Sequence, residues 1–187
     1  MLRKSENMKR IFVLILFFIS ASAFVSGIYI PADDGSSVKF KIKNLGFLTE
    51  VSIKGLKGTI DFDPVRPATA KFEVTVDANT LNTGIGARDK HLLKEEYFGA
   101  EKHPVIKLVA TKITASSGEN SFTMFCNLRI KNITKSISFP FTATPQENGY
   151  QFKGEFKINR RDYGVGGNSM TLSDNLTVFL SVFAKKQ

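Results

Sequence analysis

The strongest constraint on this chain is an alternation of apolar and polar residues that repeats along most of its length. In residues 38–43, Val, Phe and Ile alternate with three lysines. Successive side chains of a β-strand point to opposite faces, so this period of two produces one apolar and one polar face. The pattern recurs at 71–77, 137–143, 150–158 and 176–184. These segments are therefore predicted to be half-buried strands.

Three more strands complete the predicted set, at 57–63, 106–113 and 122–130. Turn-forming residues at 117–120 (SGEN) and 147–149 (ENG) separate neighbouring runs, as antiparallel hairpins require. The sequence therefore predicts an all-β protein in which eight antiparallel strands form a barrel or a sandwich.

Two stretches break the alternation. Residues 87–98 (ARDKHLLKEEYF) contain no β-branched residue and favour a short helix, which His103-Pro104 then ends. Residues 44–55 (NLGFLTEVSIKG) are ambiguous and are expected to hold either a helical turn or a bend between the first two strands.

The N-terminus has the three parts of a secretory signal peptide. Four basic residues precede nine consecutive apolar residues at 11–19, and a small-residue cleavage pattern follows at 21–23 (ASA). The apolar run is shorter than the roughly 20 residues that span a bilayer. We expect a cleavable signal peptide at 1–23, with an uncleaved anchor as the alternative. The mature protein is then a single domain at 28–187, located in the periplasm or secreted.

The formal charge of the chain raises the question of a nucleic-acid or membrane partner. The whole chain has a formal net charge of +9. The signal segment carries four positive charges and one negative charge, so its removal lowers the net charge to +6. A groove for single-stranded nucleic acid needs exposed aromatic residues among its basic ones, whereas most Phe here lie on the predicted buried faces. No nucleic-acid partner is expected, while peripheral contact with an anionic membrane stays open.

Catalytic and metal-binding patterns are weak. The lone Cys126 cannot form an internal disulfide, and its place on an apolar strand face predicts a buried, inert thiol. The stretch 36–39 fits S-x-x-K, but the companion K-T-G is absent. His91 and Glu95 stand one helical turn apart without an H-E-x-x-H motif. We therefore expect no enzyme, no catalytic residue, no metal and no cofactor.

The apolar faces carry the functional prediction. Eight strands enclose an interior that is either packed or just wide enough for one ligand, and periodicity does not separate these alternatives. The inward residues on which a ligand would lie are Phe40, Ile42, Phe62, Phe72, Val74, Val76, Phe139, Phe141, Phe152 and Phe156.

Several segments resemble a known family. Residues 83–92 (TGIGARDKHL) are similar to the T-G-x(n)-R-D-x-H-L signature of the YceI-like family. Residues 55–63 (GLKGTIDFD) resemble its G-x-x-G-x-I-x-F-D strand, and 160–165 (RRDYGV) resemble its R-x-D-F-G-I turn. The aromatic pair at 97–98 and the later proline segment at 103–106 follow the same order. The resemblance covers about residues 28–184.

This resemblance implies a fold and a ligand. Members of the family have an extended, lipocalin-like, eight-stranded antiparallel barrel with a short helix near one end and a long apolar tunnel. They hold an isoprenoid chain there, such as a polyprenyl phosphate or a quinone tail, and act as exported carriers or sequestering proteins. The expected partner is therefore a polyisoprenoid or quinone-type lipid. The rival hypothesis is a scaffold barrel with a filled core that binds other proteins, and a homodimer is compatible with either.

Two charged groups have two possible roles. Arg88, Asp89 and His91 either anchor the helix to the barrel rim or meet a phosphate or quinone oxygen at the tunnel mouth. Arg160 and Asp162 are expected to act as a turn clamp rather than as catalytic groups.

Overall fold

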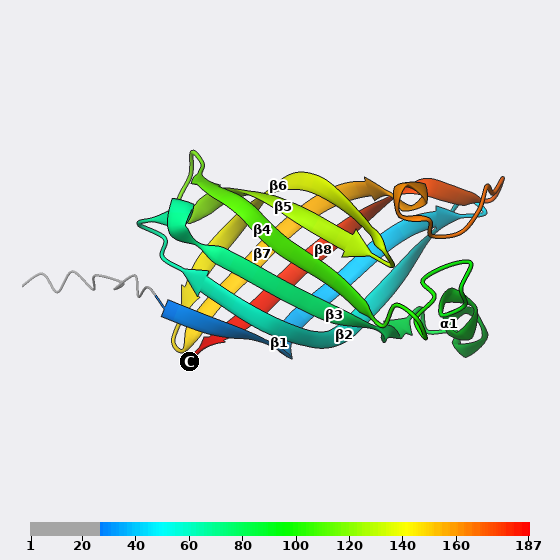
Figure 1. The fold of residues 1–187 in the computed structure, drawn as a ribbon, viewed down its shortest axis with the longest axis horizontal. Helices are drawn as coiled ribbons and strands as arrows, with labels where there is room; N and C mark the ends of the chain where they lie inside the picture. The colour runs from blue at the N-terminus through cyan, green and yellow to red at the C-terminus, as the bar shows by residue number, and fades with distance from the viewer. Residues whose placement is uncertain (1–26) are drawn as a thin grey trace, which may run out of the picture.

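The computed structural model describes residues 27–187, which form a closed, elongated barrel of eight antiparallel strands (Figure 1). Each strand pairs with the next in sequence order, and the last strand returns to pair with the first. The prediction of an antiparallel all-β fold is confirmed, and the barrel is the correct alternative. The predicted signal peptide at 1–23 lies outside the described residues.

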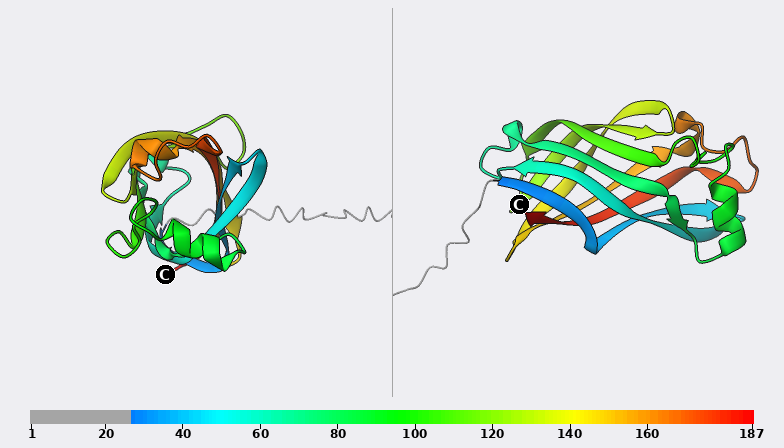
Figure 2. Two further views of the ribbon diagram at one scale, coloured as in Figure 1. Left: turned by 90° about the vertical axis from the view of Figure 1, so that its right-hand side faces the viewer. Right: turned by 60° about the horizontal axis from the view of Figure 1, so that its bottom comes forward.

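The strands are β1 (Gly27–Asn44), β2 (Phe47–Phe62), β3 (Lys71–Asn82), β4 (Val105–Ala115), β5 (Ser121–Ile130), β6 (Ile133–Gln146), β7 (Gly149–Asn159) and β8 (Leu172–Lys186). One helix, α1 (Gly86–Leu92), and two short 3-10 helices, η1 (Pro67–Thr69) and η2 (Arg160–Tyr163), lie in the connections. We call the end with α1 and η2 the helix end and the opposite end the η1 end (Figures 1 and 2). Within residues 27–187, no helix is long and apolar enough to cross a membrane.

The strands are longer than the alternation predicted, most clearly in β2. Of the two alternatives for 44–55, the helical turn is wrong and the bend is correct, because the chain reverses in two residues, Leu45 and Gly46, and β2 begins at Phe47. Their φ values of 51° and 81° are those of a type I′ turn, whose twist matches that of the flanking strands. Later in β2, the pairing with β3 shifts register twice between Ser52 and Lys57, in a stretch that holds Gly55 at a φ of 79°. These shifts interrupt the period of two, so the sequence pattern concealed the first part of the strand.

The helix is shorter than predicted. It ends at Leu92 rather than near Phe98, and the chain continues through turns in which Phe98 N–H donates to the Leu92 carbonyl and Ala100 N–H donates to that of Leu93. These turns carry Phe98 into the barrel, where its ring lies 6.2 Å from that of Phe40. Burial of this aromatic ring therefore opposes continuation of the helix.

The η1 end of the barrel is filled by aromatic rings. Phe62 is fully buried, and its ring centroid lies 5.4 Å from those of Phe122, Tyr150 and Phe152 and 5.9 Å from that of Phe72, all edge-on. Edge-to-face contacts of this kind add to the stability that comes from area burial alone. We call these five residues the aromatic plug, of which Phe72 and Phe152 also line the cavity described below.

The backbone conformation of Gly58 generates a stability prediction. A Cβ atom at this position, where φ is 130°, would lie 2.0 Å from the carbonyl oxygen of Glu73 on the neighbouring strand. Gly58→Ala is therefore expected to lower the free energy of unfolding by about 2–4 kcal/mol, measured by urea denaturation. Gly86→Ala is the control, since its Cβ would meet no atom within 4 Å, and its effect should stay within about 1 kcal/mol. Equal effects of the two substitutions would contradict this account.

Candidate functional site: an apolar cavity in the barrel

The candidate site is a cavity inside the barrel. Its volume is about 150 Å³, and all eight strands contribute to its walls. Its lining is almost wholly apolar, because the inward positions of each strand carry aliphatic or aromatic side chains. Phe98, from the connection after α1, also lines it. Such a surface binds a ligand through apolar contact.

The structure places most of the predicted ligand residues along this cavity. The lining includes Phe40, Phe72, Val74, Val76, Phe139, Phe141, Phe152 and Phe156. Two predicted residues lie elsewhere, although both are buried. Phe62 belongs to the aromatic plug, and Ile42 lies close to the β1–β2 turn, outside the lining.

Other lining residues were missed by the sequence reasoning. Met124, Leu128 and Val178 follow the alternation of β5 and β8, so a signal for them was present. Leu56 directly follows the bulge at Gly55, where the period of two is interrupted. Phe98 lies in a loop that has no periodicity. The last two become recognisable only once the chain is folded.

The barrel wall has a weak seam between β6 and β7. The two strands pair from Phe141 opposite Gly154 to their hairpin, and no pairing of 133–140 with β7 is found in the described chain. Pro140, which lacks an amide hydrogen, stands where the ladder stops. Beyond it, the rings of Phe139 and Phe156 stack with centroids 4.6 Å apart. Side-chain packing therefore replaces hydrogen bonds in this part of the wall.

The residues around α1 anchor the helix. Asp89 Oδ1 accepts hydrogen bonds from both the amide and the hydroxyl of Thr83, at 2.8 and 2.5 Å, and Arg88 donates to the Thr83 carbonyl at 3.0 Å. The ring of His91 lies 4.8 Å from that of Tyr97, and its Nε2 lies 3.4 Å from a Glu96 carboxylate oxygen. None of Arg88, Asp89 and His91 belongs to the cavity lining. These contacts favour the anchor interpretation over a role at a tunnel mouth.

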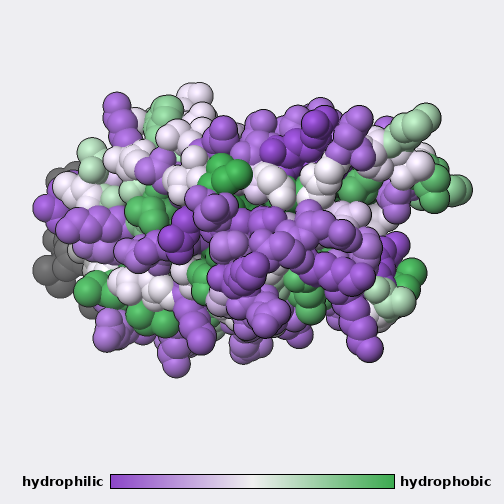
Figure 3. Space-filling model, turned by 45° about the vertical axis from the view of Figure 1, so that its right-hand side comes forward, coloured by the Kyte–Doolittle hydropathy of each residue, from purple (hydrophilic) through white to green (hydrophobic). Residues whose placement is uncertain are grey.

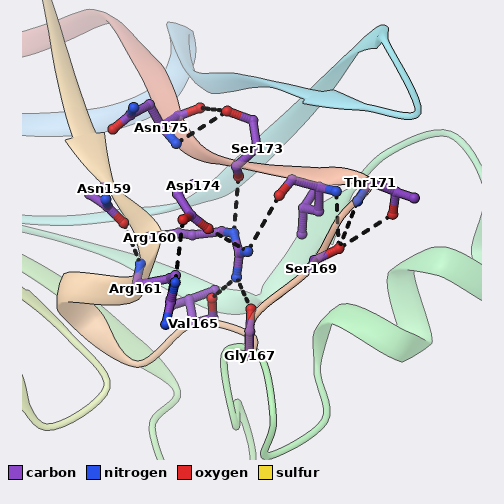
Figure 4. A network of polar contacts seen from close by, with 11 residues as sticks. Asn159, Arg160, Arg161, Val165, Gly167, Ser169, Thr171, Ser173, Asp174 and Asn175 are labelled. Atoms are coloured by element: carbon purple, nitrogen blue, oxygen red, sulfur yellow. Dashed lines mark hydrogen bonds and ion pairs between the residues drawn. The ribbon is translucent and has the colours of Figure 1, made fainter.

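Arg160 holds the helix end together (Figure 4). Its side chain is only 2% exposed, and it donates to the carbonyls of Val165 and Gly167 at 2.8 and 3.0 Å. It also donates to the Ser173 carbonyl at 3.0 Å and to the Asp174 carboxylate at 2.7 Å. A single guanidinium thus joins η2, the following loop and the start of β8.

The expected partner within the turn does not take part in this network. Asp162 is exposed, and the carboxylate that pairs with Arg160 belongs to Asp174, across the loop. Arg161 is half exposed and lies 3.5 Å from the other Asp174 oxygen. The interaction joins residues brought together by the loop, so sequence adjacency pointed to the wrong acid.

Arg160 and its neighbour provide a matched pair of variants. Arg160→Met should lower the free energy of unfolding by about 2–4 kcal/mol, because it leaves several carbonyls and a partly buried carboxylate without their donor. Arg161→Met removes only an exposed, loosely paired charge and should cost at most about 1 kcal/mol. Urea denaturation of both variants measures the difference. A mild effect at Arg160 would show that the network contributes little to stability.

Cys126 is buried, as expected from its strand position. Burial raises the pKa of its thiol to about 12. Burial likewise raises the pKa of the nearby Tyr163 hydroxyl to about 12, with smaller contributions from Asp162 and Cys126. Both groups are therefore neutral at physiological pH.

The state of this thiol is open to a direct test. At about pH 8, an aromatic disulfide reagent should label native Cys126 at least about a hundredfold more slowly than the urea-unfolded chain, because burial removes both access and thiolate. Absorbance of the released thiolate follows the reaction, and Cys126 is the only cysteine. Rapid labelling of the native protein would contradict a buried, inert thiol.

Comparisons with known proteins agree with this architecture. The chain is 29% identical over 171 residues to a "UPF0312 protein" of Pseudomonas syringae, a match that covers 85% of this chain and 88% of that one. Among solved structures, BcnA of Burkholderia cenocepacia superimposes with a TM-score of 0.75 at 22% identity, covering 80% of this chain and 96% of that one.

A second solved structure is a polyisoprenoid binding domain from Saccharophagus degradans, described as implicated in plant cell wall breakdown. It matches with a TM-score of 0.67 at 14% identity and covers 87% of this chain and all of that one. At these identities, the two structural matches establish the shared barrel. The family model for the YceI-like domain matches residues 29–184. The chain therefore belongs to the YceI-like family.

Proposed function

We propose that this protein is an exported carrier or sequestering protein that holds one long isoprenoid chain, of a polyprenyl phosphate or a quinone, inside the barrel. The observation that carries the proposal is the cavity, whose lining is apolar on all eight strands. A ligand made of hydrocarbon matches such a lining, because no polar group needs a partner there.

The affinity comes from apolar burial. Each Å² of apolar surface removed from water contributes roughly 25 cal/mol, so a chain burying about 400 Å² gains about 10 kcal/mol before the cost of ordering it. The Saccharophagus degradans domain, described as polyisoprenoid-binding, has the same barrel and supports this class of ligand. The signal peptide predicted at 1–23 supports export.

A long chain requires the interior to adjust. An apolar cavity of about 150 Å³ accommodates a group the size of benzene. We propose that interior rings change rotamer to admit the chain. The stacked Phe139 and Phe156 at the β6–β7 seam are the first to move, because no strand pairing holds the wall there.

Native mass spectrometry of protein expressed with its leader, followed by organic extraction, tests the ligand class. We expect one polyprenyl or quinone species at about one molecule per chain, and its mass identifies the chain length. An empty barrel that also fails to take up added isoprenoid would contradict the proposal and favour the scaffold hypothesis.

Filling the cavity is a sharper test than introducing charge, since a buried charge also unfolds the barrel. Val178 lines the cavity from β8 and is only partly buried, so Val178→Phe should occupy space that the ligand needs. We expect at least about a tenfold loss of bound lipid by extraction, with an unchanged circular dichroism spectrum. Lys157→Phe adds the same ring on the outer face of β7 and is the control. Full lipid retention by a folded Val178→Phe variant would exclude the cavity as the binding site.

A further inference from the structure

Exposed apolar side chains gather at the helix end of the barrel. Leu45, Phe47 and Leu48 on the β1–β2 hairpin are 67%, 78% and 62% exposed, and Met170 on the loop before β8 is fully exposed. The Leu45 amide donates to the Thr171 carbonyl at 2.8 Å, which holds the two loops together. Figure 3 shows hydrophobic residues projecting at this end, beside a largely hydrophilic side wall. We call Leu45, Phe47, Leu48 and Met170 the apolar tip.

The fold does not require an apolar residue at Leu45. Its φ of 51° lies in the left-handed region, which costs a leucine about 1–2 kcal/mol. Asn-Gly is the usual pair in a type I′ turn, because Asn tolerates positive φ. Here Leu stands before Gly46, strained and exposed to water. A residue that is unfavourable for both the backbone and solvation indicates a role outside folding.

A positive charge lies directly behind the apolar tip. Lys43 is exposed and pairs in register with Leu48 on the opposite strand. Glu50 forms ion pairs with Lys39 at 2.8 Å and with Lys41 at 3.4 Å. No carboxylate partner of Lys43 is found within residues 27–187. Its ammonium group is thus available to an anionic partner beside the apolar side chains.

We propose that the apolar tip docks the protein on an anionic lipid bilayer, with its side chains in the acyl boundary and Lys43 at the headgroup phosphates. Projecting apolar residues with a lysine behind them match the interfacial region of a membrane, where long cationic side chains reach the headgroups. A bilayer also accepts such residues without a pocket of matching shape. The docking would turn the helix end toward the membrane.

This inference deepens the proposed function, because a lipid carrier must exchange its ligand with a bilayer, but docking itself is measured separately. The probe is a vesicle of equimolar phosphatidylcholine and phosphatidylglycerol, and the readout is co-flotation of protein purified after export. All variants share one N-terminus, so differences between them report on the apolar tip.

The decisive variant is Leu45→Asn, because it should weaken vesicle binding without lowering the stability of the fold. Asn relieves the turn, so the unfolding midpoint should stay or rise, while vesicle partitioning should fall about tenfold. Val65→Ser is the matched control, because Val65 is 76% exposed on the connection before η1, at the other end, and its loss should change partitioning less than about twofold. Equal partitioning by wild type and Leu45→Asn, or an equal loss with Val65→Ser, overturns the proposal.

Two further variants keep the test informative. Met170→Gln removes a fully exposed apolar side chain of the apolar tip. If Leu45→Asn fails to fold, the loss of vesicle partitioning expected for Met170→Gln tests the docking proposal instead. Lys43→Gln should weaken binding to anionic vesicles and leave binding to pure phosphatidylcholine unchanged. Lipid extraction from the same samples separates the two proposals. If an apolar-tip variant stops floating but keeps its full lipid content, the apolar tip is the docking surface and the carrier function is unaffected. If the protein floats although its barrel is empty, the carrier function is contradicted and the docking proposal stands.

Discussion

The rest of the structure depends on the closure of β8 onto β1. Their antiparallel pairing completes a ring in which every strand has two neighbours, so no strand is an edge strand along its whole length. Because the barrel is closed, the apolar faces of all the alternating strands point into one enclosed interior. With lysines and glutamates outside and most phenylalanines inside, the same backbone forms a hydrated wall and an apolar cavity.

The two ends of this ring are finished differently. At the η1 end, edge-on rings around Phe62 fill the interior, and their packing needs no polar group. At the helix end, loops replace the regular ladder, so their carbonyls need other donors. Arg160 supplies several of these from one buried side chain, with Asp174 balancing its charge. Apolar packing therefore stabilises the η1 end, whereas hydrogen bonds stabilise the helix end, which also carries the apolar tip.

Two departures of the barrel from regularity coincide with the sites on which the proposed functions rest. The β6–β7 seam is held by the stacked Phe139 and Phe156 instead of hydrogen bonds, and such contacts rearrange without breaking a ladder. The hairpin at Leu45 keeps an apolar residue in a strained turn. In regular strands, local and tertiary preferences agree, whereas conflicts between them concentrate at functional sites.

The sequence by itself determined the fold class, the inward face of most strands and most of the cavity-lining aromatic residues, because a period of two is a local property of the chain. Motif order also indicated the YceI-like family. Only the tertiary structure decided the remaining features. The register shifts around Gly55 hide the period of two, Phe98 enters the cavity from a loop, and Asp174 rather than Asp162 meets Arg160. Each depends on contacts between segments distant in sequence, and such contacts exist only when the ring has closed.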